Sequence, residues 1–265
     1  MQLTDKVFVV TGGGNGIGRD VTLELLSYGA RVAAVDLRGD SLEETARLAA
    51  AGGRLSLHTV DVSDRAAVES LATDVPAQHG QVDGLVNVAG IIQPFVDFAD
   101  LDHPDIEKVM AVNFWGVVHT SKAFLPALVA RPEACIVNVS SMGALVPVPG
   151  QSIYGASKAA VKLLTEGLYA ELRDTRVQVT TVFPGAIETE IATNSAAELS
   201  TAGEDVDFPM TSSPEAARQI VEAIRAGSPR IRIGSDATML DRLSRLVPVR
   251  AVDLVAKKMA AVKGG

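Results

Sequence analysis

Tyr154 and Lys158 stand four residues apart at the start of a long segment with helical periodicity. Side chains at positions i and i+4 share one face of a helix, so the lysine ammonium can lie beside the tyrosine phenol. A free tyrosine has a pKa of about 10 and transfers protons poorly at neutral pH. A neighbouring cation lowers that pKa, which makes the pair a candidate for general acid/base chemistry. Taken alone, the pair is better explained as two residues on a solvated helix face.

The glycine-rich segment Thr11–Gly18 is a second chemical signal, because it follows a short apolar run and precedes an amphipathic stretch. Its key glycines are Gly12, Gly16 and Gly18, a spacing that differs from G-x-G-x-x-G. A turn without side chains lets a pyrophosphate reach the amino end of the following helix, where free N–H groups favour an anion. Its place between the first strand and the first helix favours a nucleotide site over a plain glycine turn.

Asp36 ends the second expected strand, about 20 residues past the glycines, where a carboxylate can accept both hydroxyls of an adenosine ribose. The same charge repels a 2′-phosphate, so the sequence predicts NAD rather than NADP. Asn15 occupies the loop position at which a basic residue would indicate NADP. Arg38 lies two residues past Asp36 and could weaken this discrimination. A solvated acid at a strand end is the alternative interpretation of Asp36.

Short β-branched runs alternate with longer helical stretches along the chain. The expected strands are Val7–Thr11, Arg31–Val35, Leu55–Val60, Gly84–Val88, Cys135–Val139, Val177–Val182 and Arg230–Ile233. The expected helices are Ile17–Tyr28, Ser41–Ala50, Asp64–His79, Pro104–Leu128, Ile153–Arg173 and Pro214–Ala226, with Asp64 and either Asp40 or Ser41 as N-caps. This alternation predicts a doubly wound (Rossmann) parallel sheet of about seven strands, with helices on both faces in a three-layer αβα sandwich.

The composition excludes several classes of protein. With 265 residues, 47% hydrophobic and 21% charged, the chain reads as a globular protein in one Rossmann-type domain, 1–265. A net charge of −8 argues against a nucleic-acid partner, because phosphate neutralisation needs surplus cations. One cysteine, no secretory leader pattern and no apolar run long enough to span a bilayer lead us to expect a cytoplasmic protein.

Two segments depart from the strand and helix pattern. Residues 187–213 are rich in Ala, Ser, Thr and acidic residues, and we expect them to form a substrate lid within the domain. The tail 237–265 is rich in apolar and basic residues. The tail could dock on an anionic membrane, or it could pack on the body or on a sister subunit. We favour packing, and Pro248, which interrupts the helix, weakens the membrane hypothesis further.

The chain resembles the short-chain dehydrogenase/reductase family, in its compact single-domain branch, over nearly its whole length. The matching pieces occur in the family's order: Thr11–Gly18, Asp61-Val62, Asn87-Val88-Ala89-Gly90, Asn113, Ser140-Ser141, Tyr154-x-x-x-Lys158 and Pro184-Gly185. Val88 departs from the family's usual Asn-Asn-Ala-Gly. The resemblance implies an NAD(P)-dependent oxidoreductase acting on CH–OH donors (EC 1.1.1.-).

The resemblance also implies roles for individual residues. Tyr154 is the expected acid/base, Lys158 lowers its pKa and binds the nicotinamide ribose, and Ser141 orients the substrate oxygen. Ser141 is preferred to Ser140 because it lies 13 residues before Tyr154, the family's usual spacing. Asn113 is expected to hold a water that connects Lys158 to solvent. The cofactor-binding set is Gly12, Asn15, Gly16, Ile17, Gly18, Asp36, Leu37, Asp61, Val62, Asn87, Ala89, Gly90, Tyr154, Lys158, Pro184, Gly185, Ile187 and Thr189, and the substrate-binding set is Ser141, Gln151 and Tyr154.

Three hypotheses remain at this stage. The first is an NAD-dependent dehydrogenase of secondary alcohols, with a hydrophobic substrate indicated by residues such as Met142, Val146 and Val148 near the site. The second is an NADPH-dependent carbonyl reductase, and the third is a dinucleotide-binding redox sensor without turnover. The four histidines show no metal-site spacing, so no metal is expected. The resemblance further implies a homotetramer or dimer that pairs through the helices carrying Asn113 and Tyr154.

Overall fold

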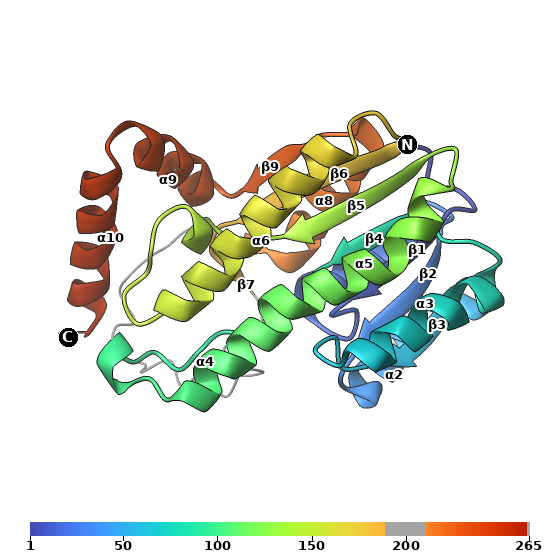
Figure 1. The fold of residues 1–265 in the computed structure, drawn as a ribbon, viewed down its shortest axis with the longest axis horizontal. Helices are drawn as coiled ribbons and strands as arrows, with labels where there is room; N and C mark the ends of the chain where they lie inside the picture. The colour runs from blue at the N-terminus through green and yellow to red at the C-terminus, as the bar shows by residue number, and fades with distance from the viewer. Residues whose placement is uncertain (189–209, 264–265) are drawn as a thin grey trace.

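The computed structural model describes residues 1–188 and 210–263, and within them seven parallel strands form one central sheet (Figure 1). The strand order is β3-β2-β1-β4-β5-β6-β9. The strands are β1 (Val7–Thr11), β2 (Arg31–Asp36), β3 (Leu55–Thr59), β4 (Gly84–Asn87), β5 (Ala134–Val139), β6 (Val177–Pro184) and β9 (Arg230–Ile233). The predicted doubly wound α/β sheet is confirmed.

The central strands are mostly apolar because helices cover both faces of the sheet. Every residue of β1, β4 and β5 is buried. The predicted strands match the observed ones to within two residues, the largest difference being at the end of β6, which runs to Pro184.

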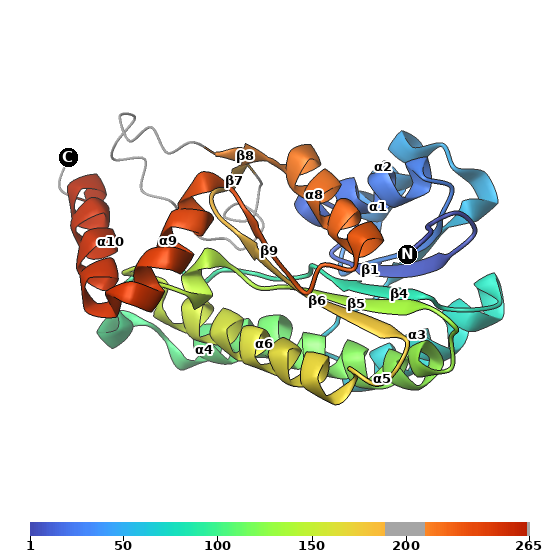
Figure 2. The same ribbon diagram turned by 90° about the horizontal axis from the view of Figure 1, so that it is seen from above.

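Helices form the outer two layers, and Figure 2 shows the sheet between them. The helices are α1 (Gly16–Ser27), α2 (Gly39–Ala49), α3 (Arg65–His79), α4 (His103–Met110), α5 (Gly116–Val129), α6 (Ser152–Glu171), α8 (Ser213–Ala226), α9 (Ser235–Leu246) and α10 (Pro248–Lys263). Helices α1, α2 and α8 lie on one face, and α3, α5 and α6 lie on the other (Figure 2). No helix among the described residues is long and apolar enough to cross a membrane.

Two of the predicted helix starts have different outcomes. Asp64 is confirmed as the N-cap of α3, since its carboxylate accepts hydrogen bonds from the N–H groups of Ala66 and Ala67. The prediction for α2 is wrong, because the helix begins at Gly39 and its N-cap is Arg38, which makes no side-chain capping bond. Asp40 instead lies in the first turn, where its negative charge suits the helix dipole.

The predicted single helix 104–128 is observed as two helices with one wide turn between them. The π-helical segment η3 (Ala111–Trp115) joins α4 to α5 and contains Asn113, which is fully buried. A π turn adds one residue to the helical repeat and often marks a functional site.

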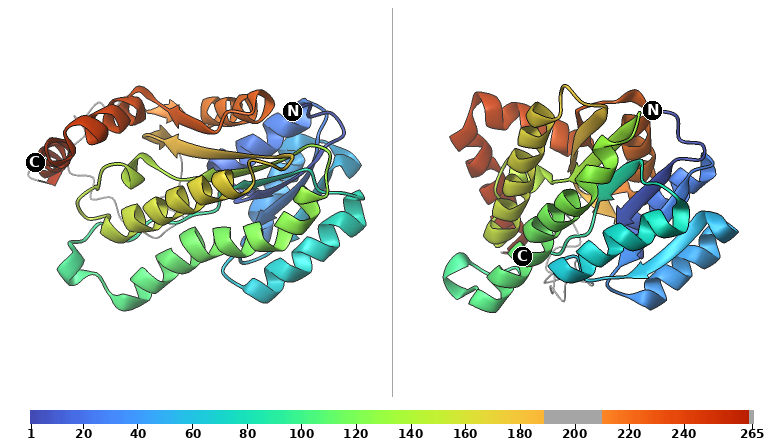
Figure 3. Two further views of the ribbon diagram at one scale, coloured as in Figure 1. Left: turned by 45° about the horizontal axis from the view of Figure 1, so that its top comes forward. Right: turned by 45° about the vertical axis from the view of Figure 1, so that its right-hand side comes forward.

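The C-terminal helices α9 and α10 form one end of the molecule (Figure 3). Leu240 of α9 and Ala251 of α10 pack against Val146, which follows the short helix η4 (Met142–Ala144). The break predicted at Pro248 is observed, since α9 ends at Leu246 and α10 begins at Pro248. The first part of the basic tail therefore packs on the body next to the segment that follows β5.

The ends of the predicted lid are ordered as a small sheet. Strands β7 (Ile187–Glu188) and β8 (Thr211–Ser212) pair in parallel beside the start of α8. Residues 189–209 of that segment lie outside the described residues.

The connections place the functional side chains at one edge of the sheet. The chain leaves β1 for β2 and β3 on one side, then crosses back to pair β4 with the other side of β1. In open α/β sheets, ligands bind beyond the carboxyl ends of the strands at the point where the order reverses. The glycine segment after β1 and the Asn87–Gly90 segment after β4 lie at that point.

Far from this edge, Ser56 on the outer strand β3 joins two histidines. Its Oγ lies 2.8 Å from Nε2 of His58 and 2.8 Å from Nε2 of His79. Burial lowers the pKa of both imidazoles, and for His79 the neighbouring His58 and Arg31 lower it further. One neutral imidazole can donate to the serine oxygen while the other accepts its proton, so the arrangement suits two uncharged rings.

We predict that the free energy of unfolding falls as pH decreases below about 6.5, the ordinary histidine value. The folded pKa of each histidine lies below the unfolded one, so the unfolded chain binds more protons in this range. For each histidine, the free energy of unfolding therefore falls by up to about 1.4 kcal/mol per unit decrease in pH. The free energy of unfolding, measured with urea between pH 5 and 8, should depend less steeply on pH in His79→Gln than in wild type. His103→Gln, at an exposed position, should keep the wild-type slope. Equal slopes in all three proteins would contradict this account of the cluster.

Candidate active site

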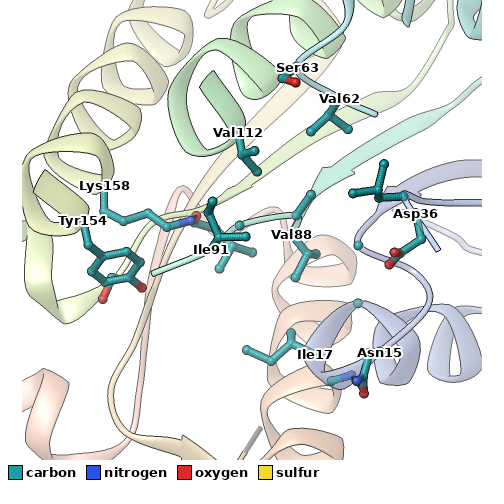
Figure 4. A pocket seen from close by; sticks show the side chains of 18 of the residues that line it. Asn15, Ile17, Asp36, Val62, Ser63, Val88, Ile91, Val112, Tyr154 and Lys158 are labelled. Carbon is teal, nitrogen blue, oxygen red and sulfur yellow. Dashed lines mark hydrogen bonds between the residues drawn. The ribbon is translucent and has the colours of Figure 1, made fainter. Parts of the chain in front are cut away.

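A cavity of about 580 Å³ runs along the carboxyl edge of the sheet. Figure 4 shows Asp36 and Asn15 on one side of it and Tyr154 and Lys158 on the other. Predicted site residues that line it are Gly12, Asn15, Gly16, Ile17, Gly18, Asp36, Leu37, Asp61, Val62, Ala89, Gly90, Ser141, Tyr154, Lys158, Pro184, Gly185 and Ile187. Elements far apart in the sequence thus bring most of the predicted set to one cavity.

The turn between β1 and α1 is closed tightly. A Cβ on Gly18 would lie 2.1 Å from the carbonyl oxygen of Gly12, so this position accepts only glycine. Asn15 is the N-cap of α1, and its side-chain oxygen accepts the N–H of Gly16 at 2.6 Å. The amino end of α1, with Gly16 and Gly18 in its first turn, lines the cavity, and such a helix end favours an anion.

The carboxylate of Asp36 is held by backbone donors at the end of β2. Gly14 donates its N–H to Oδ2 at 3.0 Å, and Arg38 donates its N–H to Oδ1 at 3.1 Å. Each carboxylate oxygen keeps a further acceptor site, so the group can still receive hydroxyl donors. Arg38 also lines the cavity, so a positive charge lies near this carboxylate.

Lys158 is 4% exposed and crosses the gap between α6 and β5. Its Nζ donates to the carbonyl oxygen of Val139 at 3.1 Å and lies 6.0 Å from the centroid of the Tyr154 ring. Gly90 allows this approach, because a Cβ there would be 3.0 Å from Nζ. Burial lowers the pKa of Lys158 to about 8.

Ser141 and Tyr154 form the reacting end of the cavity. Ser141 accepts the N–H of Gly143 at 3.0 Å and makes a side-chain hydrogen bond with Tyr154. Ser140, the alternative serine, donates to the backbone oxygen of Lys158 at 2.8 Å and is thus used to hold α6 against β5. The choice of Ser141 over Ser140 agrees with this geometry.

The pKa of Tyr154 is raised in the structure, whereas the expected lowering depends on Lys158 together with the positive charge of an oxidised nicotinamide. Burial raises it, and the hydrogen bond with Ser141 lowers it only in part. The nearby Lys158 does not reverse the effect of burial, so a lower pKa requires a further positive charge in the cavity.

Asn113 lies behind the cavity and organises the loop after β4. Its Nδ2 donates to the carbonyl oxygen of Ile91 at 2.9 Å and to Ser157 Oγ at 3.0 Å. Its Oδ1 accepts the N–H of Ile91 at 2.8 Å. Both ends of the amide are therefore used in fixing Ile91, which lines the cavity.

Two residues of the predicted binding sets, Asn87 and Gln151, do not line the cavity. Asn87 is 2% exposed and donates to Asn138 at 2.9 Å, in a buried network below the cavity. Gln151 does not line the cavity and donates to the carbonyl oxygen of Gln93 at 2.8 Å. Thr189 lies outside the described residues. Of the segment expected to face the substrate, Val146 is buried against α9 and α10.

Sequence reasoning missed other members of the site. Ser63, Val88, Ile91, Lys108, Ala111 and Val112 also line the cavity. Gln93 is fully buried next to the start of α6, and no motif in the sequence marks it. Among the described residues, no group of three or more His, Cys, Asp or Glu side chains could hold a metal ion.

The cavity fits a dinucleotide. Its volume lies in the range of cofactor sites, and Gly12, Gly16 and Gly18 line it beside the amino end of α1, where a helix favours phosphates. A carboxylate for ribose hydroxyls stands at one end, and a cation and a phenol stand at the other.

Comparisons with known proteins identify relatives of the chain. Residues 6–200 match the family model described as short chain dehydrogenase. The putative oxidoreductase SadH of Mycobacterium tuberculosis (strain ATCC 25618 / H37Rv) is 40% identical over 265 residues, covering 96% of this chain and 95% of that protein. The 1-deoxy-11-beta-hydroxypentalenate dehydrogenase of Streptomyces avermitilis is 33% identical over 247 residues, covering 92% and 89%.

Solved structures show the same fold. A short-chain dehydrogenase from Burkholderia cenocepacia J2315, in complex with NADP, superposes with a TM-score of 0.80 and 28% identity, covering 96% of this chain and 99% of that one. A short-chain dehydrogenase from Mycobacterium paratuberculosis, bound to NAD, has a TM-score of 0.78 and 25% identity, covering 90% and 100%.

The buried ammonium of Lys158 should destabilise the protein when its site holds no ligand. Its folded pKa of about 8 lies below the ordinary lysine value of 10.5, so the penalty is fully present below pH 8 and falls as pH rises towards 10.5. That shift corresponds to about 3 kcal/mol of destabilisation by the buried charge. Replacing Lys158 removes this cost but also loses its hydrogen bond to Val139, which contributes about 1 kcal/mol. We predict that Lys158→Met raises the melting temperature at pH 7 by about 3–6 °C.

Lys162→Met is the matched control, because Lys162 lies one turn along α6 and pairs with Glu166 at 3.0 Å near the surface. Scanning calorimetry should show no increase for this variant. A fall in melting temperature for Lys158→Met would contradict the account of the buried charge.

Proposed function

Because the chain belongs to the short-chain dehydrogenase family, we propose that it is an NAD-dependent oxidoreductase that interconverts secondary alcohols and ketones. The observation that carries this proposal is the grouping of Ser141, Tyr154 and Lys158 at one end of a cavity whose other end holds Asp36. This grouping places a proton-transfer group next to an oxygen-binding hydroxyl and a buried cation.

Tyr154 is the proposed general acid/base. In the direction of oxidation its phenolate removes the proton from the substrate hydroxyl, and in reduction its phenol returns a proton to the carbonyl oxygen. Ser141, which already shares a hydrogen bond with Tyr154, holds the same substrate oxygen. Because Tyr154 and Ser141 contact that oxygen together, they also orient the carbinol carbon.

Lys158 keeps the phenolate form accessible. Its ammonium lies near the Tyr154 ring and donates a hydrogen bond to the backbone of Val139. Asn113 fixes the neighbouring loop at Ile91. No carboxylate among the described residues pairs with the ammonium. When bound, the nicotinamide dinucleotide accepts or donates the hydride, and its oxidised ring adds positive charge. That charge supplies what Lys158 alone does not, since burial holds the pKa of Tyr154 above its ordinary value.

NAD is the proposed cofactor because a 2′-phosphate would meet the carboxylate of Asp36. Asp36 is held in place by Gly14 and Arg38 and cannot turn away without losing both hydrogen bonds. An NADPH-dependent carbonyl reductase is the second candidate, since Arg38 lines the same part of the cavity and a structural neighbour is a complex with NADP.

The proposed substrate is a small hydrophobic alcohol or ketone. Apolar side chains make up much of the cavity lining, among them Ile91, Val112 and Ile187. One relative is a dehydrogenase of 1-deoxy-11-beta-hydroxypentalenate, which agrees with an alicyclic substrate class. Ser141 and Tyr154 would bind its oxygen, whereas Gln151, which does not line the cavity, is not among the proposed contacts.

Assembly, domain organisation and location complete the proposal. A homotetramer or dimer is supported by exposed apolar side chains on α5, on α6 and on the π turn before α5, where Trp115 is 51% and Leu163 69% exposed.

The continuous seven-stranded central sheet supports one domain over 1–265, with 187–213 as the lid and 237–265 as the tail. A cytoplasmic location rests on the single cysteine, Cys135, which is a free buried thiol. No nucleic-acid partner and no membrane contact of the tail are proposed.

Turnover should depend on the Tyr154 phenol. Tyr154→Phe removes the proton-transfer group and is predicted to lower kcat with NAD and a hydrophobic secondary alcohol by about 100- to 10,000-fold, while dinucleotide affinity is kept. Absorbance of the reduced nicotinamide measures the rate, and calorimetry measures binding. Tyr169→Phe, at an exposed position on the same helix, is the control. Retention of most of the activity in Tyr154→Phe would exclude the proposed role.

Cofactor choice should depend on the Asp36 carboxylate. We predict that Asp36→Ala weakens NAD by about 10- to 100-fold through the loss of charge-assisted hydrogen bonds, with a much smaller effect on NADP. Asp40→Ala removes an exposed acid from the first turn of α2 and should leave both affinities unchanged. An equal loss for NAD and NADP in Asp36→Ala would argue against recognition of the ribose hydroxyls.

A further inference from the structure

Gln93 is a buried side chain near the site that the mechanism above does not include, and both ends of its amide make hydrogen bonds. It is fully buried on the loop between β4 and α4. Its Oε1 accepts the N–H of Ile153 at 2.8 Å and the N–H of Tyr154 at 3.0 Å. Its Nε2 donates to the carbonyl oxygen of Gly150 at 3.1 Å. One side chain thus holds the loop before α6 and the first turn of the helix.

Helix α6 lacks a cap of its own. The residue at its N-cap position, Gln151, makes no side-chain hydrogen bond to the helix. The first N–H groups of a helix have no partner inside it, and burying them unpaired is costly. Gln93 supplies the missing acceptor from about 60 residues earlier in the chain. One of the two N–H groups that it accepts belongs to Tyr154 itself.

The amide is the side chain that fits these three contacts. Its carbonyl end takes two donors while its amino end gives a proton to Gly150. A carboxylate would place negative charge against the Gly150 oxygen, and an apolar side chain would leave the donors unpaired. The backbone oxygen of Gln93 is used as well, since it accepts from Nε2 of Gln151 at 2.8 Å.

The same loop is tied to the rest of the site two residues earlier. Asn113 binds both the N–H and the carbonyl oxygen of Ile91, and Ile91 lines the cavity. The segment from Ile91 to Gln93 therefore joins the cavity wall to the backbone of Tyr154 through hydrogen bonds of 2.8–3.1 Å.

We infer that Gln93 is a positioning residue of the active site, which sets the place of Tyr154 by capping α6 with an uncharged oxygen. This inference rests on the proposed function for its link to catalysis. The amino end of a helix carries a partial positive charge, which an acidic cap would offset. A neutral cap leaves that charge to act on Tyr154, where negative charge develops during proton transfer.

Among the described residues, one hydroxyl and one cation lie beside the Tyr154 side chain. Ser141 shares its hydrogen bond, and Lys158 is the cation beside its ring. From the packed elements, η4 contributes Gly143 and η3 contributes Asn113, which reaches Ser157. Helix α4 also packs against α6, and its charged residues are Asp105, Glu107 and Lys108, of which Lys108 lines the cavity.

The test uses two substitutions in the full-length protein. Gln93→Met keeps the length and burial of the side chain but removes its three side-chain hydrogen bonds. Gln93→Glu keeps the acceptor and adds a negative charge. We expect Gln93→Met to lower kcat by about 10- to 100-fold, with dinucleotide affinity changed by less than about twofold because Gln93 does not line the cavity.

The Tyr154 phenol is titrated directly through the ultraviolet absorbance of its phenolate. The chain has three tyrosines, so the signal that is lost in Tyr154→Phe belongs to this residue. We expect Gln93→Glu to raise the pKa of the phenol by about half a unit or more, from the size of helix-end charge effects. The pH profile of kcat should move in the same direction.

Asp64→Ala is the matched control, since Asp64 also accepts two backbone N–H groups at a helix start, on α3. It should lower the melting temperature as Gln93→Met does, without changing kcat or the phenol titration. If both Gln93 variants lose only melting temperature, and the kcat profile and titration match wild type, the cap is merely structural and the inference fails. If Gln93→Met does not fold, an unchanged phenol pKa in Gln93→Glu overturns the inference.

The titration needs no turnover, so the two proposals fail separately. A phenol pKa that shifts in Gln93→Glu while the wild-type protein oxidises no alcohol would overturn the proposed function and support the positioning role. Wild-type turnover with no effect of either Gln93 variant would do the reverse.

Discussion

The buried ammonium of Lys158 is the constraint on which the site depends. A cation removed from water costs several kcal/mol unless nearby groups compensate it. Within the described part of the chain, Lys158 Nζ donates to the backbone oxygen of Val139 and lies 6.0 Å from the centroid of the Tyr154 ring. No carboxylate among the described residues pairs with it. A protein that keeps such a charge places it where a ligand or a reacting group can use it. The lowered pKa of Lys158 and the raised pKa of Tyr154 have the same cause, since both groups are desolvated side by side.

The parallel sheet supplies the geometry that this pair needs. Strands β1, β2, β4, β5 and β6 all end at one edge, so the residues that follow them meet although they are distant in sequence. Helix α6 then returns across the sheet and brings Tyr154 to the segment after β5. The site is therefore assembled by strand ends and one helix start, and its accuracy depends on how that helix start is fixed. Hydrogen bonds from Asn113 and Gln93 fix it by tying α6 to the loop after β4.

Much of this could be predicted from the sequence, because apolar runs and glycine turns act locally. The strands were placed to within two residues, and Asp64 was recognised as a cap from its position. The π turn at Ala111–Trp115 was missed because a helical period gives no sign of one added residue. Gln93 was missed because its partners lie 57–61 residues further along the chain, and only the fold brings them together. The pKa of Tyr154 was expected to be lowered, and burial outweighs the cation when the cavity holds no charged ligand.

The central claim is that this cavity transfers hydrogen between a carbinol carbon and a nicotinamide, with Tyr154 exchanging the proton. The most direct measurement is the fate of a deuterium label on the carbinol carbon of hydrophobic secondary alcohols incubated with NAD and the protein. The account predicts deuterium at C4 of the reduced nicotinamide, seen by NMR, and none when Tyr154 is replaced by phenylalanine. Saturated binding of NAD with no label transferred from any alcohol in a panel of alicyclic and open-chain compounds would contradict it.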